Sequence, residues 1–249
     1  MARDKTILAI GAHPDDVEFR CAGTLSRLRK KGCKIVIATV ANGDCGTAEY
    51  SAEEIARIRR GEAMASAAIL GAPYRCIGEG DLAIDCDTET RRKVTALVRE
   101  FHPLIVLTHP LVDYMVDHEV TSRLVRDACF AAGVPNFTAP GGHPPMNRIP
   151  HLYYFLPGGG TDNLGRTVPP QFLVDITAEM DVKKRMLKCH ASQRNWLLKH
   201  HGVDHYINMM AADAERLGRL AGCGCAEGFT QHLGTPYPTD NKLLEILRS

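Results

Sequence analysis

The 249-residue chain carries 30 Lys and Arg side chains against 29 Asp and Glu side chains, so its charges nearly cancel. Without a long block of basic residues, the sequence lacks the electrostatic pattern expected of a nucleic-acid-binding protein. With 45% apolar residues the chain can bury a substantial core, and small-molecule partners are favoured.

The apolar runs of the chain, such as residues 35–38 and 104–107, are far shorter than the roughly 18 residues that a membrane span needs. We therefore predict no membrane span. Charged residues occupy positions 3–5, and the apolar run behind them does not resemble a secretory leader. The nine cysteines form no CxxC pair, so we expect reduced thiols in a cytoplasmic protein.

Strand-like apolar runs alternate with amphipathic segments over the first 132 residues. This alternation is typical of βαβ units on a parallel sheet. Strands are predicted near residues 6–12, 34–40, 74–77 and 104–108. Helices are predicted near residues 15–31, 51–70, 87–100 and 117–132. The pattern predicts an α/β, Rossmann-like fold with an open, mostly parallel sheet and helices on both faces.

Residues 133–171 differ in composition, because they hold eight of the 14 prolines together with two clusters of glycine. Such density opposes regular structure, yet residues 151–155 within it are strand-like. We predict long ordered loops around this strand rather than a linker. A strand at 171–176 and helices at 178–192 and 205–220 follow. Residues 1–249 are therefore predicted to form a single domain with a helical C-terminal part from about residue 178.

The motif His-Pro-Asp-Asp at residues 13–16 directly follows the first predicted strand. Imidazole and carboxylate are usual ligands of a catalytic zinc, and a spare carboxylate beside the metal can serve as general base. Ligands bind at the carboxyl ends of the strands in an open α/β sheet, where this motif lies. A structural interpretation is also open, because Pro14 and an aspartate both suit the first turn of a helix.

A second polar cluster follows the fourth predicted strand, where residues 108–119 read Thr-His-Pro-Leu-Val-Asp-Tyr-Met-Val-Asp-His-Glu. The first and fourth strands of a doubly wound sheet are commonly neighbours, so the two loops are expected to face each other. One histidine and one aspartate from the first loop, with one histidine from the second, make the three-ligand pattern of a catalytic zinc site. The fourth position is left for water.

These motifs resemble those of the PIG-L/LmbE-like zinc-dependent N-deacetylases. The family's opening signature, A-H-P-D-D-x-E after an apolar strand, stands at residues 12–18. Three more motifs and a later H-x-S-Q match in chain order at residues 39–44, 59–71, 117–118 and 190–193. The resemblance covers most of residues 5–195.

The resemblance implies that His13, Asp16 and His118 bind Zn²⁺, with Fe²⁺ or Mn²⁺ as alternatives, and that Asp15 is the general base. The spacing is compatible with this division. His13 and Asp16 are three residues apart and can converge on one ion, whereas Asp15 is free to face the water to be activated.

The chain departs from the family at position 115. Related sequences often have H-P-D-H at the second loop, and their first histidine is credited with assisting the tetrahedral intermediate or the leaving group. Here residues 115–118 read Met-Val-Asp-His, so this histidine is missing. Tyr114 and His109 are our candidates to replace it as a catalytic donor, because both are close in sequence.

Three further residues have alternative interpretations. Asp117 is expected either to orient a ligand from outside the coordination sphere or to cap the helix that follows. The resemblance implies that Arg59 lies near the substrate and contacts sugar hydroxyls or an anionic aglycone; the alternative is a place on a solvated helix face. Asp81, in the sequence Gly-Glu-Gly-Asp, is expected to bind sugar hydroxyls or to end a turn.

We therefore expect a zinc-dependent N-deacetylase that hydrolyses the acetamide of an N-acetylglucosamine-type sugar or conjugate; the sugar comes from the resemblance alone. One alternative is a metal-dependent hydrolase of another N-acyl amine or of an ester. Another is a non-catalytic sugar- or metal-binding relative, although a protein that only binds has no need of Asp15. A homo-oligomer is compatible with the resemblance.

Overall fold

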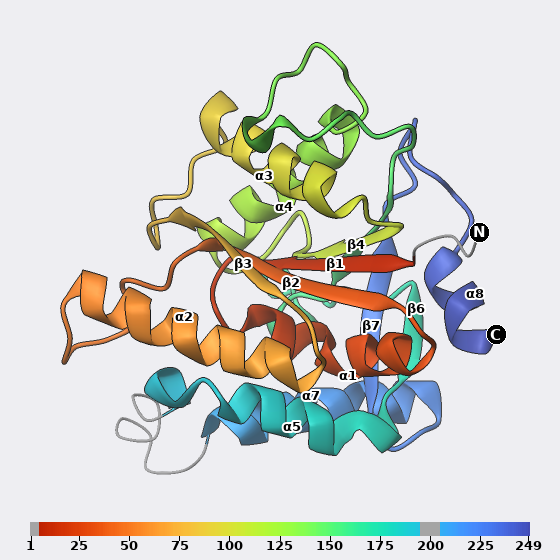
Figure 1. The fold of residues 1–249 in the computed structure, drawn as a ribbon. Helices are drawn as coiled ribbons and strands as arrows, with labels where there is room; N and C mark the ends of the chain where they lie inside the picture. The colour runs from red at the N-terminus through yellow and green to blue at the C-terminus, as the bar shows by residue number, and fades with distance from the viewer. Residues whose placement is uncertain (1–4, 195–204) are drawn as a thin grey trace.

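The computed structural model describes residues 5–194 and 205–249, and its centre is a seven-stranded sheet (Figure 1). The strands lie in the order β3-β2-β1-β4-β5-β7-β6. Neighbouring strands from β1 to β5 are parallel, whereas β7 is antiparallel to both β5 and β6. The mostly parallel sheet is thus confirmed. The strands are β1 (Thr6–Gly11), β2 (Lys34–Ala41), β3 (Tyr74–Glu79), β4 (Ile105–Thr108), β5 (His151–Phe155), β6 (Phe172–Asp175) and β7 (Ala226–Gln231).

Strand β1 lies between β2 and β4, which confirms the predicted neighbourhood of the first and fourth strands. Ile10 pairs with Ala38 of β2 on one side and with Thr108 of β4 on the other. Every residue of β1 and β4 is buried, which explains why both strands are continuous apolar runs. The loops that follow them emerge together at the carboxyl edge of the sheet, where such folds bind their ligands.

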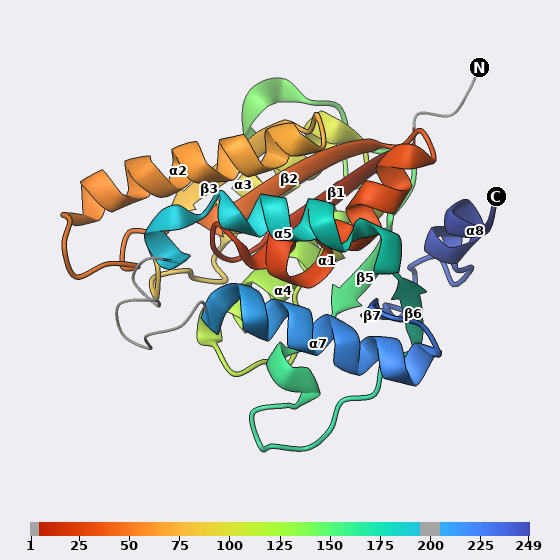
Figure 2. The ribbon, with the colours of Figure 1, turned by 90° about the horizontal axis from the view of Figure 1, so that it is seen from below.

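Helices cover both faces of the sheet (Figures 1 and 2). Alternate residues of β1 face opposite sides: Ile7 packs in one core with Leu25 of α1, and Leu8 packs in the other with Leu124 of α4. Helices α1, α2, α5 and α7 share the first side, and α3 and α4 the second. The helices are α1 (Asp16–Lys30), α2 (Ala52–Ile69), α3 (Thr88–Phe101), α4 (Val116–Ala131), α5 (Met180–Lys188), α7 (His205–Ala221) and α8 (Lys242–Arg248).

The C-terminal part is not purely helical, which corrects the sequence-based prediction. Strand β7 follows α7 and inserts between β5 and β6, so the predicted strand at 171–176 is not the last one. The sequence of β7, Ala-Glu-Gly-Phe-Thr-Gln, has neither a continuous apolar run nor strict alternation. It is nevertheless almost wholly buried, because strands pair with it on both sides.

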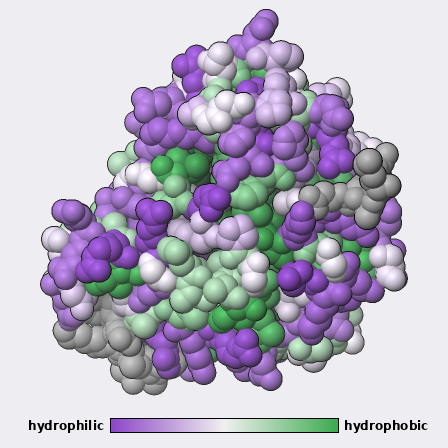
Figure 3. Space-filling view, viewed as in Figure 1, coloured by the Kyte–Doolittle hydropathy of each residue, from purple (hydrophilic) through white to green (hydrophobic). Residues whose placement is uncertain are grey.

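The Pro- and Gly-rich region forms ordered loops around β5, as predicted. Two short 3-10 turns, Pro140–Gly142 and Gly158–Gly160, interrupt these loops. On the face shown in Figure 3, apolar residues gather in patches bordered by polar side chains. Within the described ranges, no helix combines the length and apolar character required to cross a membrane.

Candidate metal centre and catalytic pocket

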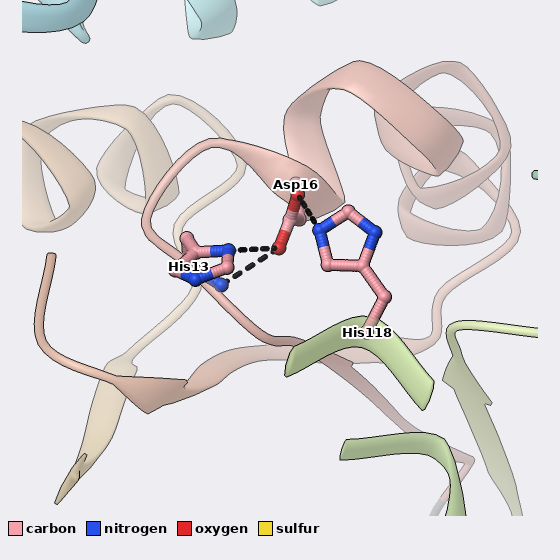
Figure 4. Close-up of side chains that lie close together, drawn as sticks. All are labelled: His13, Asp16 and His118. Atoms are coloured by element: carbon pink, nitrogen blue, oxygen red, sulfur yellow. Dashed lines mark hydrogen bonds and ion pairs between the residues drawn. The ribbon is translucent and has the colours of Figure 1, made fainter. Parts of the chain in front are cut away.

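Three side chains converge at the carboxyl edge of the sheet: His13 from the loop after β1, Asp16 from the start of α1 and His118 from the first turn of α4 (Figure 4). Asp16 lies between the two imidazoles: its Oδ2 is 3.5 Å from Nδ1 of His13, and its Oδ1 is 3.4 Å from Nε2 of His118. One potential ligand atom from each residue lies within 4.8 Å of the other two. Two imidazoles and a carboxylate in this arrangement fit a catalytic zinc site with an open position.

The backbone at the start of α1 separates the two carboxylates of the motif. Asp15 has a φ of 114°, in the left-handed region, and its side chain makes no capping hydrogen bond although it occupies the N-cap position. Helix capping therefore does not account for this aspartate. Gly11 allows the tight turn, since a Cβ there would lie 2.8 Å from Cβ of Asp16.

Two buried carboxylates fix the outer nitrogens of the histidines. Oδ2 of Asp117 lies 2.9 Å from Nε2 of His13 and also accepts a hydrogen bond from the backbone N–H of Leu82. Oδ1 of Asp113 lies 3.1 Å from Nδ1 of His118. Such partners orient ligating imidazoles, leaving Nδ1 of His13 and Nε2 of His118 to face Asp16.

The N-cap of α4 is Met115, and Asp117 lies in the first turn. Capping therefore does not account for Asp117. Asp113 was missed by the sequence analysis as an orienting residue, because nothing in the sequence distinguishes it from an ordinary loop aspartate. A second trio of potential ligands, His109, Asp113 and His118, shares one histidine with the first. His109 and Asp113 do not line the pocket, so the first trio is the better candidate.

The electrostatics of the trio favour positive charge. Burial disfavours a charged His13, but hydrogen bonds to Asp117 and Asp16 raise its pKa to about 10. Burial likewise opposes charge on His118, and the Asp16 and Asp113 carboxylates raise its pKa to about 9. Burial would raise the pKa of Asp16, but His118 and His109 hold it well below its ordinary value. The cluster thus stabilises protons on the two imidazoles, and a bound metal ion would take the place of these protons.

Asp15 is held on the other side by Arg59. The guanidinium donates through Nη2 to the backbone oxygen of Pro14 at 2.7 Å, and the same atom lies 3.3 Å from Oδ2 of Asp15. Arg59 is only 4% exposed, so it does not lie on a solvated helix face. Burial raises the pKa of Asp15, and the charge of Arg59 opposes that rise. The carboxylate is thus kept near the pocket without being drawn into the metal cluster.

The two candidate donors differ in access. His109 is fully buried, stacks on His118 with ring centroids 3.9 Å apart, and does not line the pocket. Burial and the nearby His118 lower the pKa of His109 to about 4. Tyr114 does line the pocket and packs edge-on against His118. Burial, followed by the Asp16 carboxylate, raises the pKa of Tyr114 to about 12, so its hydroxyl keeps its proton.

A cavity of about 990 Å³ opens over these residues. His13, Asp15, Asp16 and His118 line it, and Arg59 lies in its wall. Asp81 lines it too, although its carboxylate also accepts hydrogen bonds from the backbone N–H groups of residues 43 and 45. Predicted site residues that are far apart in the sequence thus line one pocket. His109, Asp113 and Asp117 lie outside its lining and contact the residues that form it.

Comparison with known proteins adds a family to this geometry. The family model PIG-L, described as GlcNAc-PI de-N-acetylase, matches residues 8–129. The diacetylchitobiose deacetylase of Thermococcus kodakarensis is 31% identical over 199 residues, which cover 76% of this chain and 70% of that protein. The chain belongs to the PIG-L family.

Other relatives of this PIG-L chain extend the likeness. The N,N'-diacetylchitobiose deacetylase structure from Pyrococcus horikoshii has a TM-score of 0.79 at 26% identity, covering 96% of this chain and 87% of that one. A 4-oxalmesaconate hydratase of Pseudomonas putida is 28% identical over 202 residues, covering 77% of this chain and 75% of that protein. Proteins named for two different reactions are thus similar to this PIG-L chain, so its own reaction has to be argued from its site.

The sequence analysis missed several residues of the PIG-L pocket. Arg20, Tyr206 and Arg216 all line the cavity. Arg20 lies four residues beyond Asp16 on α1, and this helical spacing was the one available signal. Tyr206 and Arg216 come from α7, and no local pattern indicates that this helix reaches the carboxyl edge of β1.

Proposed function

We propose that this protein is a metal-dependent N-deacetylase that removes the acetyl group from an N-acetylglucosamine-type sugar or conjugate. The observation that carries the proposal is a carboxylate, Asp15, that lines the pocket beside the three potential ligands but is not one of them. A protein that only binds sugar or metal needs no such group, so Asp15 favours turnover.

The site residues have two roles, metal binding and proton transfer. His13, Asp16 and His118 would hold the ion. A bound Zn²⁺ supplies Lewis-acid polarisation of the amide carbonyl and lowers the pKa of water to about 7. Asp15 takes a proton from the attacking water as the new C–O bond forms. It then returns this proton to the amide nitrogen, so that the C–N bond breaks to give acetate and the free amine.

The missing histidine at position 115 is compensated, in this proposal, by Tyr114. Its protonated hydroxyl is available to donate a hydrogen bond to the oxygen that becomes negative in the transition state. His109, buried behind His118, instead supports the ligand by stacking. Arg59 holds Asp15 in place from the wall of the pocket.

The sugar is supported by the relatives named as diacetylchitobiose deacetylases. Asp81, on the pocket wall, has lone pairs left to accept hydrogen bonds from sugar hydroxyls after its two backbone contacts. Arg59, between Asp15 and Asp81, is placed to donate at the same wall. The cytoplasmic location and a homo-oligomer stay predictions.

A hydratase is the second candidate. The relative named as a hydratase is similar to this chain over most of its length. In addition, Met115 stands where a typical deacetylase of this family has a histidine donor. Adding water to a double bond would also use Asp15 as the base. Hydrolysis of another N-acyl amine or of an ester needs the same residues as hydrolysis of an acetamido sugar. A panel of amides and esters therefore has to separate these three hydrolytic reactions.

The test is acetate release from a panel of N-acetylglucosamine conjugates, N-acyl amines and acetyl esters. The protein is loaded in turn with Zn²⁺, Fe²⁺ and Mn²⁺, and Asp15→Asn protein serves as the matched control. We expect release from at least one amino-sugar conjugate by the wild type and not by the variant. Wild-type protein that releases no acetate from any amide with any of the three ions would refute the deacetylase proposal.

A further inference from the structure

The geometry points to a second binding element in the same pocket: Arg20 and Arg216 form a subsite for an oxyanion, a carboxylate or a phosphate, carried by the substrate. This inference rests on the proposed function, because it names the class of N-acyl compound that the deacetylase would accept. Both arginines line the cavity that contains the candidate metal centre. Neither has a role in the hydrolysis itself.

Arg20 is placed by helix α1. It follows Asp16 by four residues, so the two side chains share one helix face about 6 Å apart along the axis. Its side chain is only 11% exposed, and its guanidinium lies 5.0 Å from the ring centre of Phe19. Among the described residues, the nearest carboxylate oxygen is Oδ2 of Asp213, which lies 3.9 Å from Nη1 and thus beyond hydrogen-bond distance. A nearly buried guanidinium thus lies one helical turn from a candidate metal ligand.

Arg216 approaches the same place from α7. Its Nη2 and Nε donate to Oδ1 of Asp213 at 2.6 Å and 3.1 Å. Asp213 is therefore the ion-pair partner of both guanidiniums, so that two guanidiniums share one carboxylate. Arg59 differs, since it faces the two carboxylates of Asp15 and Asp81.

Glycines keep the two guanidiniums accessible. A Cβ on Gly158 would lie 3.0 Å from Nη2 of Arg20, and one on Gly160 would lie 2.8 Å from Nη2 of Arg216. Side chains at these two positions would clash with the guanidinium groups. Asp162, the other acidic residue of this wall, already accepts backbone hydrogen bonds through Oδ1 from residues 164 and 166. Among the described residues, Asp162 forms no ion pair with either guanidinium, and both pair with Asp213 instead.

The ligand class follows from the chemistry of the guanidinium group. Two planar donors with one shared counter-ion suit an oxyanion that accepts several N–H bonds at once. The anion of the substrate has to lie about 5 to 6 Å, the rise of one helical turn, from the acetamide that is cleaved. We therefore infer an N-acetyl amino sugar whose aglycone carries a carboxylate or a phosphate.

The experiment compares three matched compounds: methyl, carboxymethyl and 1-phosphate derivatives of N-acetylglucosamine. For wild-type, Arg20→Gln, Arg216→Gln and Arg219→Gln proteins, kcat/KM is measured on each compound. Wild-type protein should prefer at least one anionic compound over the neutral one by about tenfold, the effect of one charge-assisted hydrogen bond. The preference should collapse in Arg20→Gln and Arg216→Gln. It should persist in Arg219→Gln, because Arg219 is exposed on α7 and does not line the cavity.

A binding measurement separates the two proposals. Calorimetry with zinc-loaded Asp15→Asn protein and the same compounds requires no turnover. Preferential binding of an anionic compound that depends on Arg20, with no acetate release by the wild type, would support the subsite and refute the deacetylase. Equal binding of neutral and anionic compounds would overturn the subsite whatever the activity. The better of the two anionic compounds identifies a carboxylate or a phosphate as the natural group.

Discussion

Arg59 of α2 and Asp15, the residue before α1, meet in the wall of the pocket, with Nη2 of the arginine 3.3 Å from Oδ2 of the aspartate. The arginine is 4% exposed and also holds the backbone of Pro14. The candidate base is thus positioned by side-chain and backbone contacts at once. This arrangement explains how Asp15 stays beside the metal centre without joining it.

Replacing Asp15 by Asn should abolish most turnover while leaving the metal centre intact. The amide cannot accept a proton from water, and general-base catalysis typically contributes about 10²- to 10⁴-fold to a rate. We expect kcat to fall within that range. Zinc content, measured by elemental analysis, should stay close to one ion per chain. A variant that loses its zinc would make Asp15 a ligand and contradict the assignment.

Replacing Asp117 by Asn should weaken metal binding rather than chemistry. Asp117 fixes Nε2 of His13, and loss of such an outer contact typically costs about 10- to 100-fold in metal affinity. Competition with a chelator of known affinity measures the change. Asp127→Asn is the matched control, because Asp127 lies on the same helix and pairs with Arg126 outside the pocket. Equal affinities of the two variants would argue against His13 as a ligand.

Metal affinity should rise steeply between pH 6 and pH 9. The raised pKa values of about 10 for His13 and about 9 for His118 mean that both rings hold protons in the metal-free protein at neutral pH. A metal ion binds neutral imidazole, so it has to displace these protons, and its apparent affinity increases as they dissociate. Calorimetry in buffers of different ionisation enthalpy should detect proton release at pH 7. Binding without proton release, at an affinity independent of pH, would be inconsistent with these ligands.

Replacing Tyr114 by Phe should lower kcat more than it raises KM. The change removes one donor to the developing oxyanion, an effect of about 10²-fold in comparable sites. His109→Ala should instead lower stability and metal affinity, because His109 is buried against His118. Steady-state kinetics and thermal unfolding of the two variants separate these effects. If both variants kept full kcat, neither residue would replace the missing histidine.

The part of the fold that positions the candidate site could be predicted, because β1 and β4 are buried on both faces and their sequences are continuous apolar runs. Strand β7 could not be predicted, because its extended conformation depends on pairing with β5 and β6 and its own sequence has no apolar pattern. The same distinction holds in the pocket. His13, Asp16 and His118 stand in recognisable motifs, whereas Arg216 reaches the pocket only through the packing of α7.

The φ of 114° at Asp15 has a consequence for the stability of the protein as well as for its geometry. A non-glycine residue in such a conformation costs roughly 1 to 3 kcal/mol, which glycine would largely avoid. Asp15→Gly and Asp15→Ala both lose the carboxylate that pairs with Arg59, so the strain accounts for their difference, and the glycine variant should unfold at the higher temperature. The residue proposed as general base thus occupies a conformation that its own backbone disfavours, and strain of this kind clusters at active sites.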